Sequence, residues 1–182
     1  MAARHGLRPL PVEGGLFRQT WAGPAGPDGR PAGTAIVVLL TGATAEHPRG
    51  DFSALHRLPT DEVWHFYEGD PLTLLTLLPD GTDRLVRLGG PGGEVQTVVP
   101  AGAWMGARVG DGGQWSLFGT TMAPGFLPED YDGADAATVE RLCARHPHHA
   151  PLIRALHRPE APSRMPDDHD PDDPDAPQET EP

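Results

Sequence analysis

Two side chains that can transfer protons or bind a metal ion, His56 and Glu62, stand close together in the stretch 50–69. An imidazole and a carboxylic acid can act as a general base and a general acid, and both are common metal ligands. The surrounding residues predict two strands, 51–58 and 61–67, joined as a hairpin by a proline–threonine turn. The chemistry depends on whether these strands turn both side chains into one dry cavity.

Short apolar runs that are typical of strands continue on both sides of this stretch. Separated by glycine- and proline-rich turns, they cover residues 16–21, 34–41, 72–78, 83–88, 94–99, 104–109 and 115–122. The run 34–41 is continuously apolar with β-branched members, which indicates a strand buried on both faces. Regularly spaced strands with no helix among them predict an all-β sandwich or closed barrel.

The pattern changes to helical spacing after the last strand. Val139, Leu142 and Cys143 fall on one face of a helix that Pro147 ends, and residues 150–157 predict a second short helix. Both helices are expected to pack on the outside of the barrel. Cys143 is the only cysteine and is expected to be a small apolar residue of the first helix.

Composition predicts one folded domain followed by a tail. Residues 1–157 form the domain, with the barrel over 7–132 and a helical appendage over 133–157. Residues 158–182 are rich in proline and acidic residues and contain almost nothing apolar. Such a segment cannot bury enough surface to offset the entropy lost on ordering, so it is expected to be disordered.

Charge and composition also exclude classes of partner. The net charge is −12, most of it in the tail, and no basic stripe exists to neutralise phosphates, so nucleic acid is not expected. The apolar runs are too short to cross a bilayer, and the N-terminus lacks the apolar segment of a signal peptide, so no membrane partner is expected. A single cysteine cannot form an internal disulfide, which fits a cytoplasmic location.

The spacing in the stretch 50–69 resembles the first signature of the cupin superfamily. That signature is a glycine, five residues, His-x-His, three or four residues, a glutamate, six residues and a glycine. Every interval fits, but Leu58 stands in the place of the second histidine. The second signature, Pro-x-Gly with a histidine three residues on, is echoed by residues 100–105, with Met105 in the place of that histidine.

A more specific resemblance is to the uncharacterised cupin branch labelled "predicted sugar epimerase", or cupin family 5. It extends over roughly residues 9 to 157 and is carried by the segments 13–17, 34–40, 56–72, 99–104 and 123–131. The resemblance implies a cupin jelly-roll barrel (a double-stranded β-helix) with short C-terminal helices. It also implies a small-molecule ligand inside the barrel and a homodimer. The usual residue of this branch at position 105 is glutamine, so Met105 departs even from this pattern.

The resemblance further implies a metal site with four ligand positions, of which this chain keeps two. Leucine cannot ligate a metal, and a methionine thioether suits Cu(I) better than Fe(II), Mn(II) or Zn(II). A divalent metal would therefore be held by His56 and Glu62 alone, and no tightly bound cofactor is expected. His65 is not expected to be a third ligand, because side chains alternate along a strand and His65 should face away from Glu62.

Without a metal, His56 and Glu62 are the expected catalytic residues of an isomerase or epimerase acting on a sugar-like or polar carbonyl metabolite. Two alternatives stay open: a non-catalytic metabolite-binding cupin, and a metal-dependent cupin oxygenase or lyase with a degenerate site. The side chains expected to line the pocket and bind substrate are Phe52, Arg57, Trp64, Phe66, Trp104 and Met105.

Some candidate residues also have a purely structural interpretation. Arg57 can be a solvated strand residue, and the tryptophans can be core residues. Glu13 precedes two glycines that indicate a turn, or it can form the lip of a pocket. The histidines at 146, 148 and 149 could indicate metal binding, but their position beside Pro147 favours an ordinary helix end.

Overall fold

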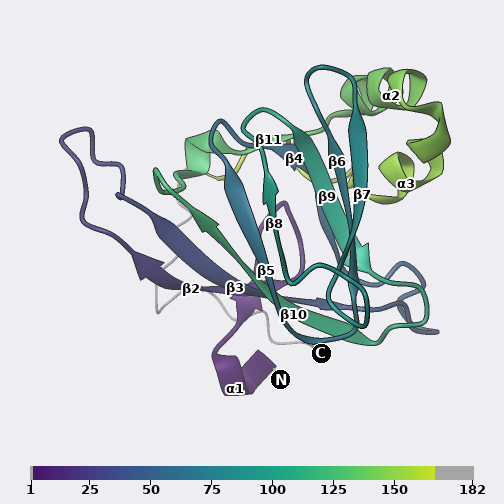
Figure 1. Cartoon of the computed structure of the whole chain (residues 1–182), viewed down its shortest axis with the longest axis horizontal. Helices are drawn as coiled ribbons and strands as arrows, with labels where there is room; N and C mark the ends of the chain where they lie inside the picture. Colours follow the sequence, from purple (N-terminus) through teal and green to yellow (C-terminus); the bar gives the residue numbers. More distant parts are fainter. Residues whose placement is uncertain (1, 167–182) are drawn as a thin grey trace.

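Two antiparallel sheets face each other in the computed structural model, which describes residues 2–166 (Figure 1). In sheet order, the six strands of the first sheet are β1 (Arg8–Pro9), β2 (Leu16–Ala22), β3 (Thr34–Thr41), β10 (Trp115–Met122), β5 (Glu62–Gly69) and β8 (Gln96–Val99). The five strands of the second sheet are β11 (Asp132–Gly133), β4 (Phe52–Arg57), β9 (Trp104–Val109), β6 (Leu72–Leu77) and β7 (Asp83–Leu88). The predicted all-β jelly-roll fold is confirmed.

The predicted strands are present with boundaries within two residues of those expected from the sequence. β6 and β7 form the expected hairpin around the turn at residues 79–81, because Leu72–Leu77 pairs in register with Asp83–Leu88. β3 is buried over Val38, Leu39 and Leu40, as its apolar run predicts, whereas residues 35–37 are only half-buried.

The predicted hairpin between β4 and β5 is wrong, because these strands lie in opposite sheets. β4 pairs with β9 and β11, while β5 pairs with β10 and β8. The turn between them is bonded to the loop before β9: the Gly102 N–H donates to the Leu58 carbonyl at 2.8 Å, and the Ala101 N–H donates to Asp61 Oδ1 at 2.8 Å. The proline–threonine turn therefore carries the chain from one sheet to the other.

The main core fills the space between the sheets. Trp64 of β5 stacks on Phe118 of β10, with ring centroids 5.0 Å apart and planes tilted by 5°. Both rings are about 1% exposed, and leucines of β6 and β7 complete the same cluster. This packing fixes the interior faces of both sheets.

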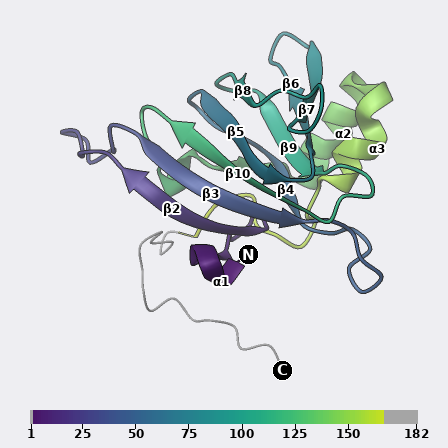
Figure 2. The ribbon, with the colours of Figure 1, turned by 60° about the horizontal axis from the view of Figure 1, so that its bottom comes forward.

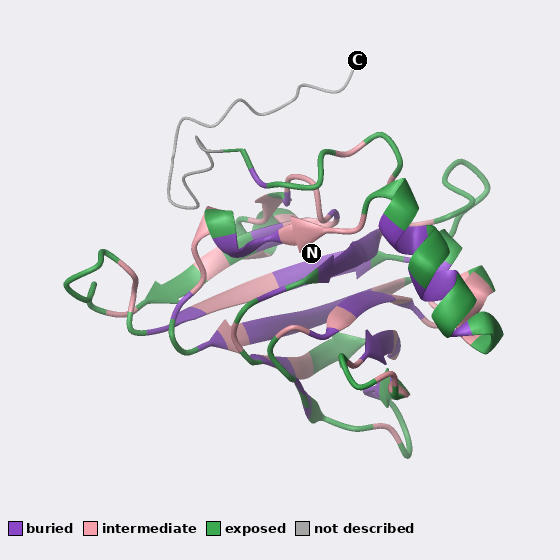
Figure 3. Ribbon diagram, turned by 90° about the horizontal axis from the view of Figure 1, so that it is seen from above, coloured by how far each residue is buried: buried purple, intermediate pink, exposed green. Residues whose placement is uncertain are grey.

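A second apolar cluster lies on the outer face of the second sheet. It is covered by α2 (Ala136–Arg145) and α3 (Ala150–Ala155), which are joined by η2 (Pro147–His149) and which both present buried residues to the sheet (Figure 3). Val139, Leu142 and Cys143 are buried there, as their spacing predicts. Asp135 caps α2 by accepting a hydrogen bond from the Thr138 N–H at 2.7 Å.

The two ends of the described chain return to the barrel. α1 (Ala2–His5) lies beside the first sheet, near β2 (Figure 2). Arg158 lies over the ring of Phe52 at 4.5 Å, and Met165 is buried, so the described part of the predicted disordered tail packs on the barrel. The rest of that prediction, 167–182, lies outside the described residues. No described helix is long and apolar enough to span a membrane.

Candidate functional site

His56 faces the barrel interior because β4 contains a β-bulge. Ser53 pairs with Ala107 and His56 pairs with Met105, so β4 has one residue more than β9 between these two pairs. The extra residue places Ala54 and Leu55 together in the outer cluster under the helices. A regular strand would put Ser53 and His56 on opposite faces, but the bulge puts both of them inside.

The bulge is held by backbone hydrogen bonds from three other segments. The Ala54 N–H donates to the Glu13 carbonyl at 2.9 Å, and the Leu55 N–H donates to the Leu156 carbonyl at 2.8 Å. The Leu55 carbonyl accepts from the Ala134 N–H at 2.8 Å. The polar groups that leave the β4–β9 ladder are therefore paired, which stabilises the bulge.

The same bulge sets the tautomer of His56. Its Nδ1 lies 2.7 Å from the carbonyl oxygen of Ala54, and a carbonyl can only accept a hydrogen bond. Nδ1 must therefore carry a proton. In the neutral imidazole, Nε2 is then the unprotonated nitrogen and is available as a base.

Glu62 enters the same interior from the first residue of β5, in the other sheet. Trp64 Nε1 donates to Glu62 Oε2 at 2.8 Å, and the Thr120 hydroxyl is a second hydrogen-bond partner. Burial raises the pKa of Glu62 to about 7, while the charge of His56 and these two hydrogen bonds act in the opposite direction. Glu62 can therefore hold a proton near neutral pH and act as an acid.

His56 and Glu62 both line a cavity of about 190 Å³ with a mainly apolar wall. Tyr131 completes one side of it by stacking on the imidazole of His56, with centroids 5.0 Å apart and an 18° tilt. The residues that line the cavity are Leu10, Glu13, Phe17, Gln19, Pro31, Thr34, Ile36, His56, Leu58, Glu62, Thr120, Met122, Phe126, Leu127, Pro128, Tyr131 and Met165. The arrangement places one base and one acid in a small, poorly hydrated space.

An ion pair joins two chain segments of the cavity wall. Arg30 binds both carboxylate oxygens of Asp130, at 2.5 and 3.0 Å, and its guanidinium also donates to the Gly125 carbonyl. Pro31 follows Arg30 and Tyr131 follows Asp130, and both of these neighbours line the cavity. The pair therefore links the loop between β2 and β3 to the segment that carries Tyr131.

The side chains expected to bind substrate do not line this cavity. Trp64 and Met105 are buried in the core next to His56 and Glu62, and Phe66 packs at the edge of that core. Phe52 belongs to the outer cluster. Arg57 points outward, where it pairs with Asp132 at 2.6 Å and lies over Trp104. Strand alternation explains the outward position of Arg57, since it follows the inward-facing His56.

The cavity includes polar residues that were not assigned to the site from the sequence. Tyr131 comes from the segment after β10, and Thr120 from β10 itself. Burial raises the pKa of the Tyr131 hydroxyl above its ordinary value. Glu13 lines the cavity and accepts a hydrogen bond from Ser53 Oγ at 2.6 Å, which agrees with its interpretation as a pocket lip. Sequence spacing to His56 gives no signal for Tyr131, because the contact depends on how β11 returns to β4.

The residues of the cavity do not fit a cupin-type metal centre. Leu58 lines the cavity in the place of one histidine, and Met105 lies opposite His56 on β9 in the place of another. His65 faces the other side of β5, where it bonds Thr121 at 3.1 Å. Within residues 2–166, no compact group of three metal-ligating side chains contains His56 or Glu62. Two donors alone would hold a divalent ion weakly.

The sequence pattern of a family described as "Cupin superfamily (DUF985)" matches residues 1–134. A solved protein from Shewanella oneidensis is 30% identical with a TM-score of 0.73, over 87% of this chain and 96% of that one. A hypothetical protein from Leishmania major is also 30% identical, with a TM-score of 0.69, over 86% and 96% of the two chains. No curated protein matches this chain.

More distant solved structures share the fold alone. Oxalate decarboxylase of Bacillus subtilis is 13% identical with a TM-score of 0.55, and the match covers 88% of this chain but 40% of that one. Another structure of that enzyme concerns its Mn(II) centres. A cupin 2 domain-containing protein from Halorhodospira halophila is 14% identical with a TM-score of 0.54, over 84% and 88% of the two chains.

Proposed function

The chain belongs to the cupin superfamily, in the family DUF985, and from this premise we propose that it is an isomerase or epimerase acting on a small polar carbonyl metabolite by acid–base catalysis. The observation that carries the proposal is the convergence of His56 and Glu62, from opposite sheets, on one apolar cavity. His56 can act as a base because its tautomer leaves Nε2 unprotonated, and Glu62 can act as an acid because burial raises its pKa.

The proposed reaction begins when His56 Nε2 removes the proton from the carbon next to a carbonyl. The C–H bonding electrons move into an enolate, and the imidazole becomes an imidazolium. Because Glu62 comes from the facing sheet, it can deliver its proton to the same carbon from the other side, which inverts the configuration. His56 and Glu62 then return to their starting protonation states by exchange with solvent. Proton transfers of this kind contribute about 10²- to 10⁴-fold to a rate.

The dimensions of the cavity support a small substrate. A volume of about 190 Å³ is below the roughly 300–1,000 Å³ of sites for drug-sized ligands. Tyr131 holds one face of the His56 ring, so the substrate would meet Nε2 at the edge of that ring. The wall excludes water and strengthens the electrostatic interactions of both catalytic groups.

The test begins with mass spectrometry of the ligand that co-purifies with the protein, followed by incubation of that ligand with the enzyme in D₂O. We expect wild type to incorporate one deuterium next to the carbonyl. His56→Gln and Glu62→Gln should each slow the incorporation at least 100-fold, which is the lower end of the expected acid–base contribution. His65→Gln is the matched control, because His65 lies on the outer side of the same strand as Glu62.

A second candidate function is the non-catalytic binding of a metabolite. The same measurement distinguishes it from catalysis. Glu62 has two protein hydrogen-bond partners, Trp64 and Thr120, an arrangement that a binding site could also use to orient a ligand. Saturable binding by wild type with no deuterium incorporation would support the binding protein and overturn the enzyme. Incorporation that His56→Gln and Glu62→Gln leave unchanged would overturn the assignment of the catalytic pair.

A further inference from the structure

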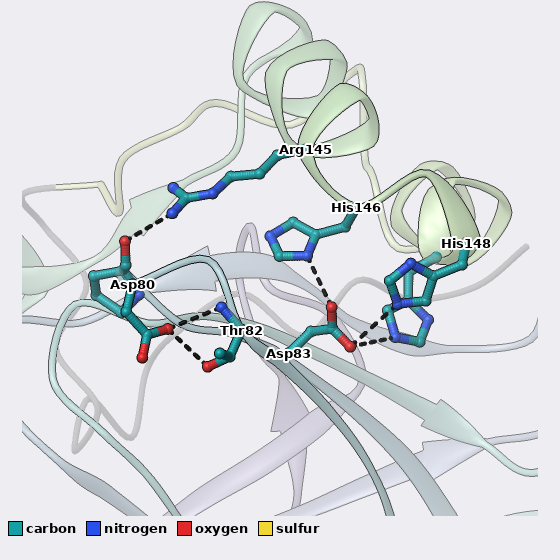
Figure 4. Close-up of polar contacts among 8 residues, drawn as sticks. Asp80, Thr82, Asp83, Arg145, His146 and His148 are labelled. Atoms are coloured by element: carbon teal, nitrogen blue, oxygen red, sulfur yellow. Dashed lines mark hydrogen bonds and ion pairs between the residues drawn. The ribbon is translucent and has the colours of Figure 1, made fainter.

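Three histidines and one aspartate gather where the segment after α2 meets the start of β7 (Figure 4). None of them lines the cavity. Asp83 is the first residue of β7, while the histidines follow α2 and continue through η2. One oxygen of Asp83 lies 3.2 Å from His148 Nε2 and 3.0 Å from His149 Nε2. Its other oxygen lies 3.0 Å from His146 Nδ1.

We propose that Asp83, His148 and His149 bind a divalent transition-metal ion of the zinc class. Two imidazoles and one carboxylate form a donor set suited to such ions, with an open side for water. The ligand atoms of these three residues all lie within 4.8 Å of one another. This site shares no residue with the cavity, so it does not depend on the proposed function.

The distances match the spacing of ligands around a single ion. Bonds of about 2.0–2.2 Å at angles of about 90–110° place neighbouring ligand atoms roughly 3 Å apart. The two distances from Asp83 to the imidazole nitrogens are 3.0 and 3.2 Å. An ion can therefore replace the two N–H···O hydrogen bonds with little movement of the side chains. In each neutral imidazole the proton moves from Nε2 to Nδ1, so no net proton is lost.

Two further contacts hold the segments that carry the ligands in place. Arg145 donates to the Pro79 carbonyl at 3.0 Å, which joins the end of α2 to the turn before β7 (Figure 4). His146 is buried, and its hydrogen bond fixes the orientation of the Asp83 carboxylate. Hydrogen bonds of this kind, made to a metal ligand from outside the coordination sphere, commonly change metal affinity 10- to 100-fold. The geometry of Asp83 is thus set independently of His148 and His149.

Exposure leaves room for the ion to enter. The side chains of His148, Asp83 and His149 are 61%, 21% and 14% exposed. Water can occupy the remaining coordination positions. Because the ligands come from β7 and from the connection between α2 and α3, a bound ion would join the helical appendage to the barrel.

The test uses the full chain after treatment with a chelator, titrated with Zn²⁺ by calorimetry and with Co²⁺ by visible absorption. We expect wild type to bind one ion at this site. The visible absorption spectrum of the bound Co²⁺ should be that of a coordination site of low symmetry. His148→Gln/His149→Gln should weaken binding at least 10-fold. His47→Gln is the matched control at an exposed histidine, and His56→Gln tests the cavity; both should keep wild-type affinity.

Hydrogen exchange provides a second readout that does not depend on other metal-binding groups of the chain. Zn²⁺ should slow exchange in residues 136–155 of wild type, because an ion that joins the helices to β7 opposes their opening. It should have no such effect in His148→Gln/His149→Gln. The proposal is overturned if the double variant binds Zn²⁺ as tightly as wild type, or if Zn²⁺ leaves exchange in these helices unchanged.

Discussion

The phenol ring of Tyr131 stacks on the imidazole of His56, with centroids 5.0 Å apart. Tyr131 is 1% exposed and lies between the short helix η1 (Pro128–Asp130) and β11, which pairs with β4 at His56. The stack therefore fixes one face of the proposed base and fills part of the interior. Both roles can be tested by changing the ring and the hydroxyl separately.

Tyr131→Ala should lower the free energy of unfolding by about 3–5 kcal/mol, as expected when a buried aromatic side chain is removed. Tyr131→Phe keeps the stack and should lower it by less than about 1.5 kcal/mol. Urea denaturation monitored by fluorescence measures both values. Equal losses in the two variants would show that the hydroxyl, rather than the ring, stabilises this side of the cavity.

Glu62 should make the protein less stable as pH rises. Its pKa is about 7 in the folded state against an ordinary value of 4.5, so between these values the folded state binds more protons than the unfolded state. The free energy of unfolding should therefore fall from about pH 4.5 to about pH 7 and stay reduced above it, by ~3 kcal/mol as an order of magnitude. Denaturation curves across this range measure the change.

Glu62→Gln is the variant that isolates this contribution. It should remove the decrease, so that the variant gains stability over wild type as pH rises toward 8. Glu68→Gln, at an exposed position of the same strand, should follow wild type. Parallel pH curves for wild type and Glu62→Gln would contradict the assignment of a buried acid.

Arg57→Ala should leave ligand binding unchanged. The Arg57 side chain is 49% exposed and pairs with Asp132 on the outer surface, and exposed ion pairs contribute about 0–1 kcal/mol to stability. Ligand titration compares this variant with His56→Gln, its inward-facing neighbour, which should lose affinity. A loss of binding in Arg57→Ala would return this residue to the substrate-binding set predicted from the sequence.

Leu58→His/Met105→His should create a metal centre in the cavity. The two substitutions restore the histidines of the cupin signatures beside His56 and Glu62, giving the four donors that a divalent ion needs. Elemental analysis after dialysis with Mn²⁺ should show about one ion more in the double variant than in wild type, and a smaller increase in Leu58→His alone. A folded double variant with the metal content of wild type would mean that the cavity cannot close around an ion.

Much of the fold follows from the sequence because the strands are short apolar runs between glycine- and proline-rich turns. The β6–β7 hairpin was predictable for this reason, since the proline, aspartate and glycine of its turn at residues 79–81 are typical of tight turns. The β4–β5 hairpin was not, because a proline–threonine turn fits both a hairpin and a crossing between sheets. The choice is made by hydrogen bonds to residues 101 and 102, about 40 positions away in the chain.

The candidate site was predictable in His56 and Glu62, and Glu13 was predicted as the lip of a pocket only as one of two alternatives. The spacing of His56 and Glu62 resembles the cupin signature, and both line the cavity. The rest of the wall comes from segments whose positions depend on long-range pairing, such as Tyr131 and Met165. Asp83 likewise meets the histidines only because α2 ends beside the start of β7.

The additional residue in β4 makes the length of this strand as important as its composition. At this length, a strand without the bulge would turn Ser53 and His56 to opposite faces. Deleting one of the two residues between them would remove the bulge and leave both side chains inside, because they would then stand two positions apart in a regular strand. The deletion would, however, remove some of the backbone groups that bond Glu13, Leu156 and Ala134, and it would change the carbonyl that faces His56 Nδ1. The additional residue therefore determines how the imidazole is held rather than which side of the sheet it faces.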